Sequence, residues 1–206
     1  MKRGRLFVIA APSGAGKTTL VKALLASEPQ LRVSVSHTTR KKRPTEELGR
    51  EYHFVTVAQF EALVARGEFL EHARVFDNYY GTSRAFVEEQ LAAGRGVVLE
   101  IDWQGAQQVR RAMPECVSIF ILPPSRQALT DRLARRATDT ADVIARRLAD
   151  SVADMSHYRE FGYVVVNDDF DKAVGDLRRI VEGQGEDLRS DRPELRPLLT
   201  ELLAAP

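Results

Sequence analysis

The chain has 206 residues, which is long enough to bury one sizeable core and favours a single globular unit. Its 30 basic and 29 acidic side chains nearly cancel at a net charge of +1, so a general electrostatic attraction to nucleic acid or to an anionic membrane is not expected. The single cysteine, Cys116, excludes an intramolecular disulfide framework and a metal site made of cysteines, which fits a reducing, cytoplasmic setting.

Short apolar runs alternate along the chain with longer segments whose apolar residues recur at helical spacing. Several of the runs are apolar on successive residues, as in parallel strands that are covered on both faces. Strands are predicted at residues 5–10, 31–36, 96–102, 117–122 and 163–167. Helices are predicted at residues 17–26, 83–93, 103–113, 125–136, 141–158 and 169–181. The alternation indicates an α/β fold with a doubly wound core, in which helices flank a parallel sheet.

Two stretches interrupt this alternation. Residues 37–82 hold a basic loop, YHFVTV, a short helix and FLEHARVF, which together predict a small β-rich insertion, and a shorter insertion lies near residues 135–142. The polar stretch after Glu182 is predicted to be a linker. The apolar end of the tail could pack on the core or on a second copy of the chain, so a homo-oligomer stays open. No segment approaches the ~18 consecutive apolar residues that a membrane span needs.

The segment IAAPSGAGKTTL joins the first predicted strand to the first predicted helix. It matches the phosphate-binding pattern G-x-x-x-x-G-K-[ST], except that Ala11 stands in place of the first glycine. Alanine is accommodated there without strain if its φ lies near the β region. The predicted nucleotide-binding residues of this loop are Ala11, Pro12, Ser13, Gly14, Ala15, Gly16, Lys17, Thr18 and Thr19.

The residue types of the loop suit phosphate chemistry. Lys17 would reach the β- and γ-phosphates, and the hydroxyl of Thr18 would hold Mg²⁺. Because Pro12 lacks an N–H group, we expect the phosphate cradle to be built from the amides of residues 14–18. The alternative is a glycine-rich turn without a ligand, but the buried strand before it and the helix after it favour a nucleotide site.

Several ordered motifs resemble the guanylate kinase family: APSGAGKTTL, VSHTTRKKRP, GREYHFV, GEFLEHARVFDNYYGTS, VVLEIDWQGAQQVR and VNDDFDKA. The resemblance covers about residues 4–182, and Ala11 is a familiar variant of the loop in that family. It implies a P-loop core, a GMP-binding subdomain and a lid over ATP. The corresponding ranges are 4–36 and 83–182 for the core, 37–82 for the GMP-binding subdomain, 134–142 for the lid and 183–206 for a C-terminal tail.

Basic side chains crowd the segment SHTTRKKR at the start of the larger insertion. Taken alone, such a run would more often be a solvated loop or a nucleic-acid patch. The planar fork of arginine grips phosphate through two hydrogen bonds, so two arginines and a tyrosine hydroxyl can fix a monophosphate. By the resemblance, Arg40, Arg43 and Tyr52 hold the phosphate of GMP, and Tyr80 adds a further hydroxyl.

By the resemblance, Glu71 faces the guanine base, and Ser36, Thr82, Glu100 and Asp102 complete the pocket. Guanine presents N1–H and N2–H donors on one edge, and a carboxylate only accepts, whereas adenine presents the opposite character there. Glu100 and Asp102 end a predicted strand, where α/β folds bind their ligands, and their alternation would place both side chains on one face. Asp102 could also hold Mg²⁺ through water.

Five arginines lie in the segment DRLARRATDTADVIARRL, which on its own could be two solvated helix faces. By the resemblance, Arg136 and Arg147 reach the transferring phosphate and Arg135 contacts ATP. The segment departs from the usual R-G-R-G lid pattern, so the division of labour between Arg135 and Arg136 stays open. Asn167 and Asp168, after the last strand, resemble the adenine-side residues, although an ordinary strand-to-helix turn would look the same. The predicted catalytic residues are Lys17, Arg136 and Arg147.

The resemblance implies Mg²⁺-dependent transfer of the ATP γ-phosphate to GMP and dGMP, which gives ADP and GDP in purine nucleotide recycling. Such a transfer needs positioning and charge neutralisation rather than a catalytic serine or cysteine. One alternative is the peptide-binding guanylate-kinase-like module of scaffold proteins, which typically lacks an intact phosphate loop. Another is a relative that phosphorylates a ribose phosphate, for which a guanine-reading Glu71 would be useless. No nucleic acid or membrane partner is expected.

Overall fold

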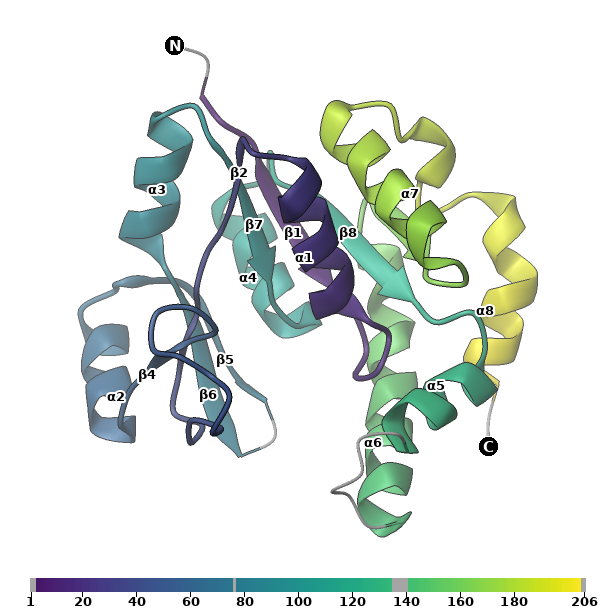
Figure 1. Ribbon diagram of the computed structural model, residues 1–206, viewed down its shortest axis with the longest axis horizontal. Helices are drawn as coiled ribbons and strands as arrows, with labels where there is room; N and C mark the ends of the chain where they lie inside the picture. The colour runs from purple at the N-terminus through teal and green to yellow at the C-terminus, as the bar shows by residue number, and fades with distance from the viewer. Residues whose placement is uncertain (1–2, 76, 135–140, 205–206) are drawn as a thin grey trace. The chain divides into compact units, whose positions relative to one another are not determined.

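Strand β1 (Leu6–Ala10) is buried along its whole length, as its uninterrupted apolar sequence predicts. It belongs to a five-stranded sheet in the order β2-β7-β1-β8-β9, and the pairs β2–β7 and β8–β9 are parallel. The computed structural model describes residues 3–75, 77–134 and 141–204, without the side chains of residues 141–147 (Figure 1). The α/β class with a helix-flanked parallel sheet is therefore confirmed.

The chain forms two compact units, which are described separately. The first comprises Met1–Val8 and Pro29–Cys116, and the second comprises Ile9–Glu28 and Val117–Pro206. In the first unit, the elements from the parallel sheet and its helices are β2 (Leu31–Val33), α3 (Arg84–Ala92), β7 (Gly96–Glu100) and α4 (Trp103–Ala112). The strands predicted at 31–36 and 96–102 are shorter than expected. β7 ends at Glu100 because Asp102 is the N-cap of α4, where its side chain accepts a hydrogen bond from the amide of Gly105.

The insertion expected at residues 37–82 forms a four-stranded sheet in the order β4-β3-β6-β5. Its strands are β3 (His37–Thr38), β4 (His53–Phe54), β5 (Phe69–Val75) and β6 (Asn78–Ser83), with helix α2 (Val57–Ala65) between β4 and β5. A reciprocal pair of hydrogen bonds between Thr56 and Gln59 starts α2. The buried ring of Phe60 then packs against Phe69 and Tyr79, with centroids 4.7 and 5.4 Å apart, and joins the helix to the sheet.

The second unit holds the other end of the parallel sheet and the helices that cover it. Its elements before the tail are α1 (Lys17–Ser27), β8 (Val117–Leu122), α5 (Arg126–Ala134), α6 (Ala141–Met155), the 3₁₀ turn η1 (Ser156–Glu160), β9 (Tyr163–Val166) and α7 (Phe170–Glu182). Helix α1 packs against α7, and α5 packs against α6. Asp169 caps the start of α7, and Gly183 ends it with a φ of 82° that suits glycine.

The C-terminal tail packs within the second unit. The stretch after Glu182 is not the linker that its polar sequence predicts, because it folds into the 3₁₀ turns η2 (Glu186–Leu188) and η3 (Pro193–Leu195), and Leu188 and Leu195 are buried. Helix α8 (Arg196–Leu202) follows, and Arg126 at the start of α5 donates to the carbonyl of Leu202 over 3.1 Å. Within the described parts of the chain, no helix is both long and apolar enough to cross a bilayer.

Candidate functional site

The loop between β1 and α1 depends on two glycines in the second unit. Gly14 and Gly16 have φ values of 89° and 92°, in the left-handed region that side-chain-bearing residues rarely adopt. A Cβ on Gly16 would also lie 2.5 Å from Nδ2 of Asn167, which is closer than two such atoms can approach. Both the backbone conformation and the available space therefore require glycine at position 16.

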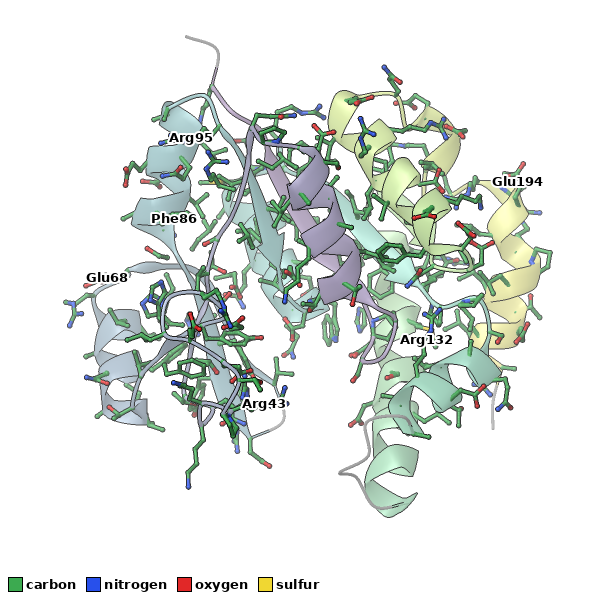
Figure 2. All side chains as sticks on the ribbon, viewed as in Figure 1. Arg43, Glu68, Phe86, Arg95, Arg132 and Glu194 are labelled. Atoms are coloured by element: carbon green, nitrogen blue, oxygen red, sulfur yellow. The ribbon has the colours of Figure 1, made fainter. Side chains whose placement is uncertain are left out.

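The carbonyl of Ala15 ties this loop to the rest of the second unit. It accepts hydrogen bonds from Nδ2 of Asn167 at 2.8 Å and from Nη1 of Arg132 at 3.3 Å, and Arg132 also donates to the backbone carbonyl of Asn167 at 3.0 Å. Figure 2 labels Arg132, which comes from helix α5. The Ala15 amide donates to the carbonyl of Pro12 at 3.2 Å. One of the amides of residues 14–18, which are expected to bind phosphate, is therefore hydrogen-bonded within the loop itself. Asn167 is 7% exposed and holds the loop from the end of β9.

Helix α1 begins at Lys17, directly after the loop, and its N-cap is Gly16, which has no side chain to cap the first turn. Helices α4 and α7, in contrast, start with aspartates that accept hydrogen bonds from first-turn amides. An anion at the start of α1 would meet the positive end of the helix without displacing a capping carboxylate. Thr18 and Thr19 are exposed on this first turn. Ser13, before the glycines, accepts a hydrogen bond from the hydroxyl of Ser151 at 3.3 Å through its carbonyl.

Glu71 is a buried acid in the first unit. Its side chain lies on β5 and is 3% exposed, and Thr82 on the paired strand β6 donates its hydroxyl to Oε1 over 2.6 Å. The register explains the contact, because Glu71 and Thr82 are direct cross-strand partners next to a bulge after Phe69. Burying a carboxylate is costly unless hydrogen bonds satisfy it, and the hydroxyl of Thr82 supplies such a bond to Glu71. Packing alone would not require an acid at this position.

The other residues predicted around the base belong to three different segments of the first unit. Ser36 precedes β3, and its carbonyl accepts a hydrogen bond from the amide of His53 at 2.9 Å. Glu100 is the last residue of β7 and is partly buried. Asp102 differs from the expectation of a strand residue, because its two carboxylate oxygens accept from the amide of Gly105 at 2.8 Å and from the side chain of Gln104 at 3.1 Å.

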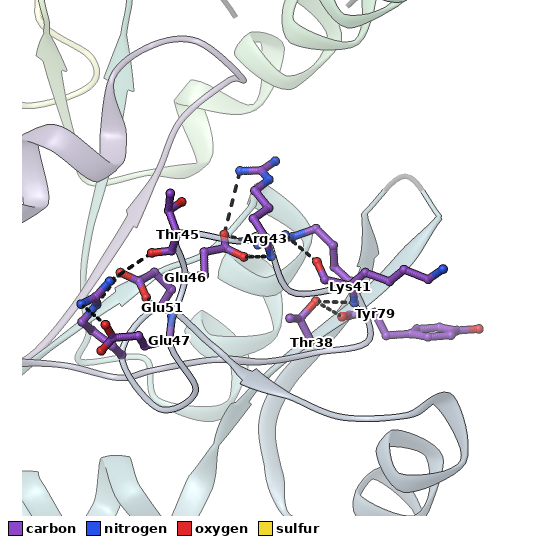
Figure 3. A network of polar contacts seen from close by, with 10 residues as sticks. Thr38, Lys41, Arg43, Thr45, Glu46, Glu47, Glu51 and Tyr79 are labelled. Carbon is purple, nitrogen blue, oxygen red and sulfur yellow. Dashed lines mark hydrogen bonds and ion pairs between the residues drawn. The ribbon is translucent and has the colours of Figure 1, made fainter. Parts of the chain in front are cut away.

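Arg40 and Arg43 converge on Glu46, a buried acid in the loop after β3. Oε1 of Glu46 lies 2.6 Å from Nη2 of Arg40 and 3.9 Å from Nη1 of Arg43, and Oε2 accepts from the Arg43 amide at 2.8 Å (Figure 3). The Arg40 guanidinium and then the Arg43 amide hold the pKa of the Glu46 carboxyl below its usual range, against the opposing effect of burial. Glu46 thus orients two cations whose remaining donors can meet an anionic ligand.

Two tyrosines lie beside these arginines. The guanidinium of Arg40 sits over the ring of Tyr52, 5.2 Å from its centroid, and the rings of Tyr52 and Tyr80 meet edge to face at 5.9 Å. Burial raises the pKa of the Tyr52 phenol, so it keeps its proton and can act as a hydrogen-bond donor at neutral pH. The structure therefore brings Arg40, Arg43, Tyr52 and Tyr80 together around one region of the first unit.

Comparisons with known proteins show the family to which the chain is related. The family model described as "Guanylate kinase" matches residues 3–184. A guanylate kinase from Methylococcus capsulatus is 58% identical over 98% of this chain and 100% of its own, and one from Chromohalobacter salexigens is 57% identical over 98% and 94%. The crystal structure of guanylate kinase from Anaplasma phagocytophilum is 32% identical, with a TM-score of 0.75 over 97% of this chain and 95% of that chain.

The chain belongs to the guanylate kinase family. Two of the three arginines predicted to contact ATP or the transferring phosphate, Arg135 and Arg136, lie outside the described residues. Arg147 falls within α6, but its side chain is likewise outside the description. Asp168 is exposed before α7, where its carboxylate accepts from the amide of Asp169 at 2.8 Å. The individual site roles predicted from the guanylate kinase resemblance therefore stay predictions.

The structure adds two residues that sequence reasoning did not single out. Arg132 is one of five arginines in its segment, and helical spacing gives no sign that it reaches the loop carbonyl at Ala15. Glu46 follows a basic run in a loop, where its polar surroundings suggest an exposed acid, yet it is only 9% exposed. Both contact other predicted site residues and stand in no motif of their own, so only the fold reveals them.

Proposed function

We propose that the chain transfers the γ-phosphate of ATP to GMP and to dGMP, giving ADP and GDP. The single observation that carries this proposal is the buried Glu71, held by Thr82 in the same unit as the Arg40, Arg43, Tyr52 and Tyr80 group. A buried acceptor for guanine N–H groups together with cations for a monophosphate suits GMP. Family membership supports the same reaction, because the relatives at 58 and 57% identity carry the name guanylate kinase.

The ATP phosphates would bind at the loop and the first turn of α1. The backbone of the loop, whose turn depends on Gly14 and Gly16, offers amide donors there. Lys17 at the start of α1 supplies the cation predicted to contact the β- and γ-phosphates. In the reaction, the bond between the γ-phosphorus and the oxygen bridging it to the β-phosphate breaks, and an oxygen of the GMP phosphate forms the new bond. The lysine stabilises negative charge that shifts toward the leaving ADP.

Magnesium fits this site as a companion of the nucleotide. Among the residues that the structure describes, no group of three or more His, Cys, Asp or Glu side chains could hold a metal ion. Mg²⁺ commonly binds through substrate phosphates and waters with few protein ligands, and Thr18, an exposed residue with a hydroxyl group, suits such a role. When bound, Mg²⁺ neutralises charge on the β- and γ-phosphates. A water-mediated contact of Asp102 with Mg²⁺ would have to coexist with the hydrogen bonds that its carboxylate accepts from Gly105 and Gln104.

A panel of phosphate acceptors tests the reaction directly. ADP formation is measured with ATP and Mg²⁺ against GMP, dGMP, AMP, UMP and ribose 1,5-bisphosphate. Turnover confined to GMP and dGMP is expected. Turnover with the sugar phosphate alone would contradict the proposal, and ATP binding without turnover on any acceptor would favour a peptide-binding module.

Purine nucleotide recycling is the process that this reaction serves, since it returns a monophosphate to the diphosphate level. The cytoplasmic location expected from the single cysteine and the assembly of several copies remain predictions. Neither is needed for the proposed chemistry, because each substrate has candidate ligands within one chain.

A further inference from the structure

Helix α4 packs against strand β5 in the first unit, and this contact includes the residue that would read guanine. Two residues of α4, one helical turn apart, contact the strand. Gly105 lies beside the carboxylate of Glu71, and Gln108 lies beside the backbone of His72, the next residue of the strand. The two contacts therefore act on successive positions of β5.

Space alone requires glycine at position 105. Its φ is not among the positive values of the described glycines, so alanine would fit its helical backbone. A Cβ there would lie 2.4 Å from Oε2 and 3.1 Å from Cδ of Glu71, and 3.3 Å from Oδ1 of Asp102. The tip of a flexible side chain often moves aside at little cost, but Glu71 is 3% exposed and its Oε1 is held by Thr82 at 2.6 Å. Alanine at position 105 would therefore displace the carboxylate from its hydrogen-bonded position.

Gln108 fixes the strand on which this carboxylate sits. β5 is an edge strand of the four-stranded sheet, so one side of its backbone has no neighbouring strand. The side-chain amide of Gln108 takes that place at His72, accepting from its N–H at 3.1 Å and donating to its carbonyl at 2.8 Å. Two hydrogen bonds from one rigid amide fix both the distance and the orientation of the backbone next to Glu71.

We infer that Gly105 and Gln108 are positioning residues that set the selectivity for guanine by placing Glu71. The first turn of α4 also presents the positive end of a helix to the acid, which favours a negative charge there. The inference rests on the proposed phosphorylation of GMP and adds that the selectivity depends on a helix that need not touch the base. Neither residue has a side chain that could take part in phosphoryl transfer.

The test compares two identical substitutions in different helices. Gly105→Ala is expected to reduce kcat/KM for GMP by about 10²-fold, as misplacement of a binding group by about 1 Å can do. The loss should appear mainly in KM for GMP and in the ratio of GMP to AMP turnover, with KM for ATP unchanged. Gly175→Ala in α7 is the matched control, because a Cβ there would meet nothing within 4 Å. It should leave both KM values unchanged and raise the melting temperature slightly.

Rescue separates positioning from damage to the fold. Glu71→Asp shortens the acid by one methylene, so the double variant Glu71→Asp with Gly105→Ala should lose less activity than the sum of the single losses predicts. Purely additive losses would overturn the positioning role of Gly105. If Gly105→Ala does not fold, Gln108→Ala decides, since it adds no atoms. Gln108→Ala is expected to raise KM for GMP several-fold with KM for ATP unchanged, and an unchanged KM for GMP would overturn the inference.

The wild-type protein distinguishes this inference from the function on which it rests. A wild type that does not phosphorylate GMP refutes the proposed function itself. A wild type that is active on GMP, with a Gly105→Ala variant that is folded and retains both kcat/KM for GMP and the preference over AMP, refutes only the role of α4.

Discussion

The loop between β1 and α1 is held by hydrogen bonds to its backbone, whereas Glu71 is held by a hydrogen bond to its side chain. In the loop, two glycines permit the turn, and the carbonyl of Ala15 takes the hydrogen bonds that anchor it. Around Glu71, the key contact is a hydroxyl donated by Thr82 from the neighbouring strand. A phosphate can be bound by backbone amides, which every residue except proline carries. Recognition of a base needs particular side chains in particular places.

The largest effect on turnover is expected from the side chain that the loop contributes to the site, that of Lys17. Lys17→Ala should lower kcat by at least about 10²–10³-fold, because it removes a preorganised charge that stabilises the transition state. The backbone of the loop and helix α1 should keep their shape, so the melting temperature should change little. Lys22→Ala, an exposed lysine on the same helix, is the matched control. Near-normal turnover in a folded Lys17→Ala variant would contradict the mechanism.

In the other region, Glu71→Gln tests whether charge and acceptor geometry select the base. The amide is nearly isosteric but presents one acceptor and one donor group, so guanine should lose one charge-assisted hydrogen bond. We expect kcat/KM for GMP to fall by roughly 10- to 100-fold, which corresponds to about 1.5–3 kcal/mol. Steady-state kinetics with GMP and AMP measure the change, with Glu61→Gln on the exposed side of α2 as control. An unchanged ratio of the two activities would remove the base-reading role of Glu71.

The two regions also differ in how far the sequence predicts them. The loop is one uninterrupted segment between a buried strand and a helix, so its pattern and its setting can be read together. The same holds for β8, whose predicted and observed bounds agree, because an apolar run that stops at two prolines defines a buried strand. Local order along the chain is the shared reason why both can be predicted.

The sequence alone could not predict contacts between segments that are far apart along the chain. Arg132 reaches Ala15 across 117 positions of the chain, and the arginine-rich segment gives no hint of that partner. Asp102 was expected to end a strand because an apolar run precedes it, but its competing tendency to cap a helix decides its position. For the predicted GMP site, the resemblance to a family provides candidate residues, and only the fold shows which of them are in contact.

A smaller effect is expected when the anchor of the loop is removed. Asn167→Ala deletes the 2.8 Å hydrogen bond to the carbonyl of Ala15, but Arg132 still donates to the same oxygen. The loss should therefore be near that of one hydrogen bond, about 1 kcal/mol, which corresponds to a several-fold rise in KM for ATP. KM for GMP should stay constant, because no GMP-binding residue is predicted near Asn167. An equal rise in both constants would mean that the whole chain, rather than the loop, is disturbed.

The smallest expected effect concerns Glu46, whose pKa is lowered chiefly by the Arg40 guanidinium. A carboxyl with a folded-state pKa below its unfolded value of about 4.3 stabilises the fold at higher pH and loses that contribution as pH falls through the folded-state value. Glu46→Gln should therefore lower the free energy of unfolding by about 1 kcal/mol at neutral pH, with a difference that shrinks below about pH 4. Urea unfolding across this range measures the trend, and Glu47→Gln is the control, since its pair with Arg50 is exposed. A pH-independent difference would mean that packing, rather than the charge that orients the two arginines, makes Glu46 important.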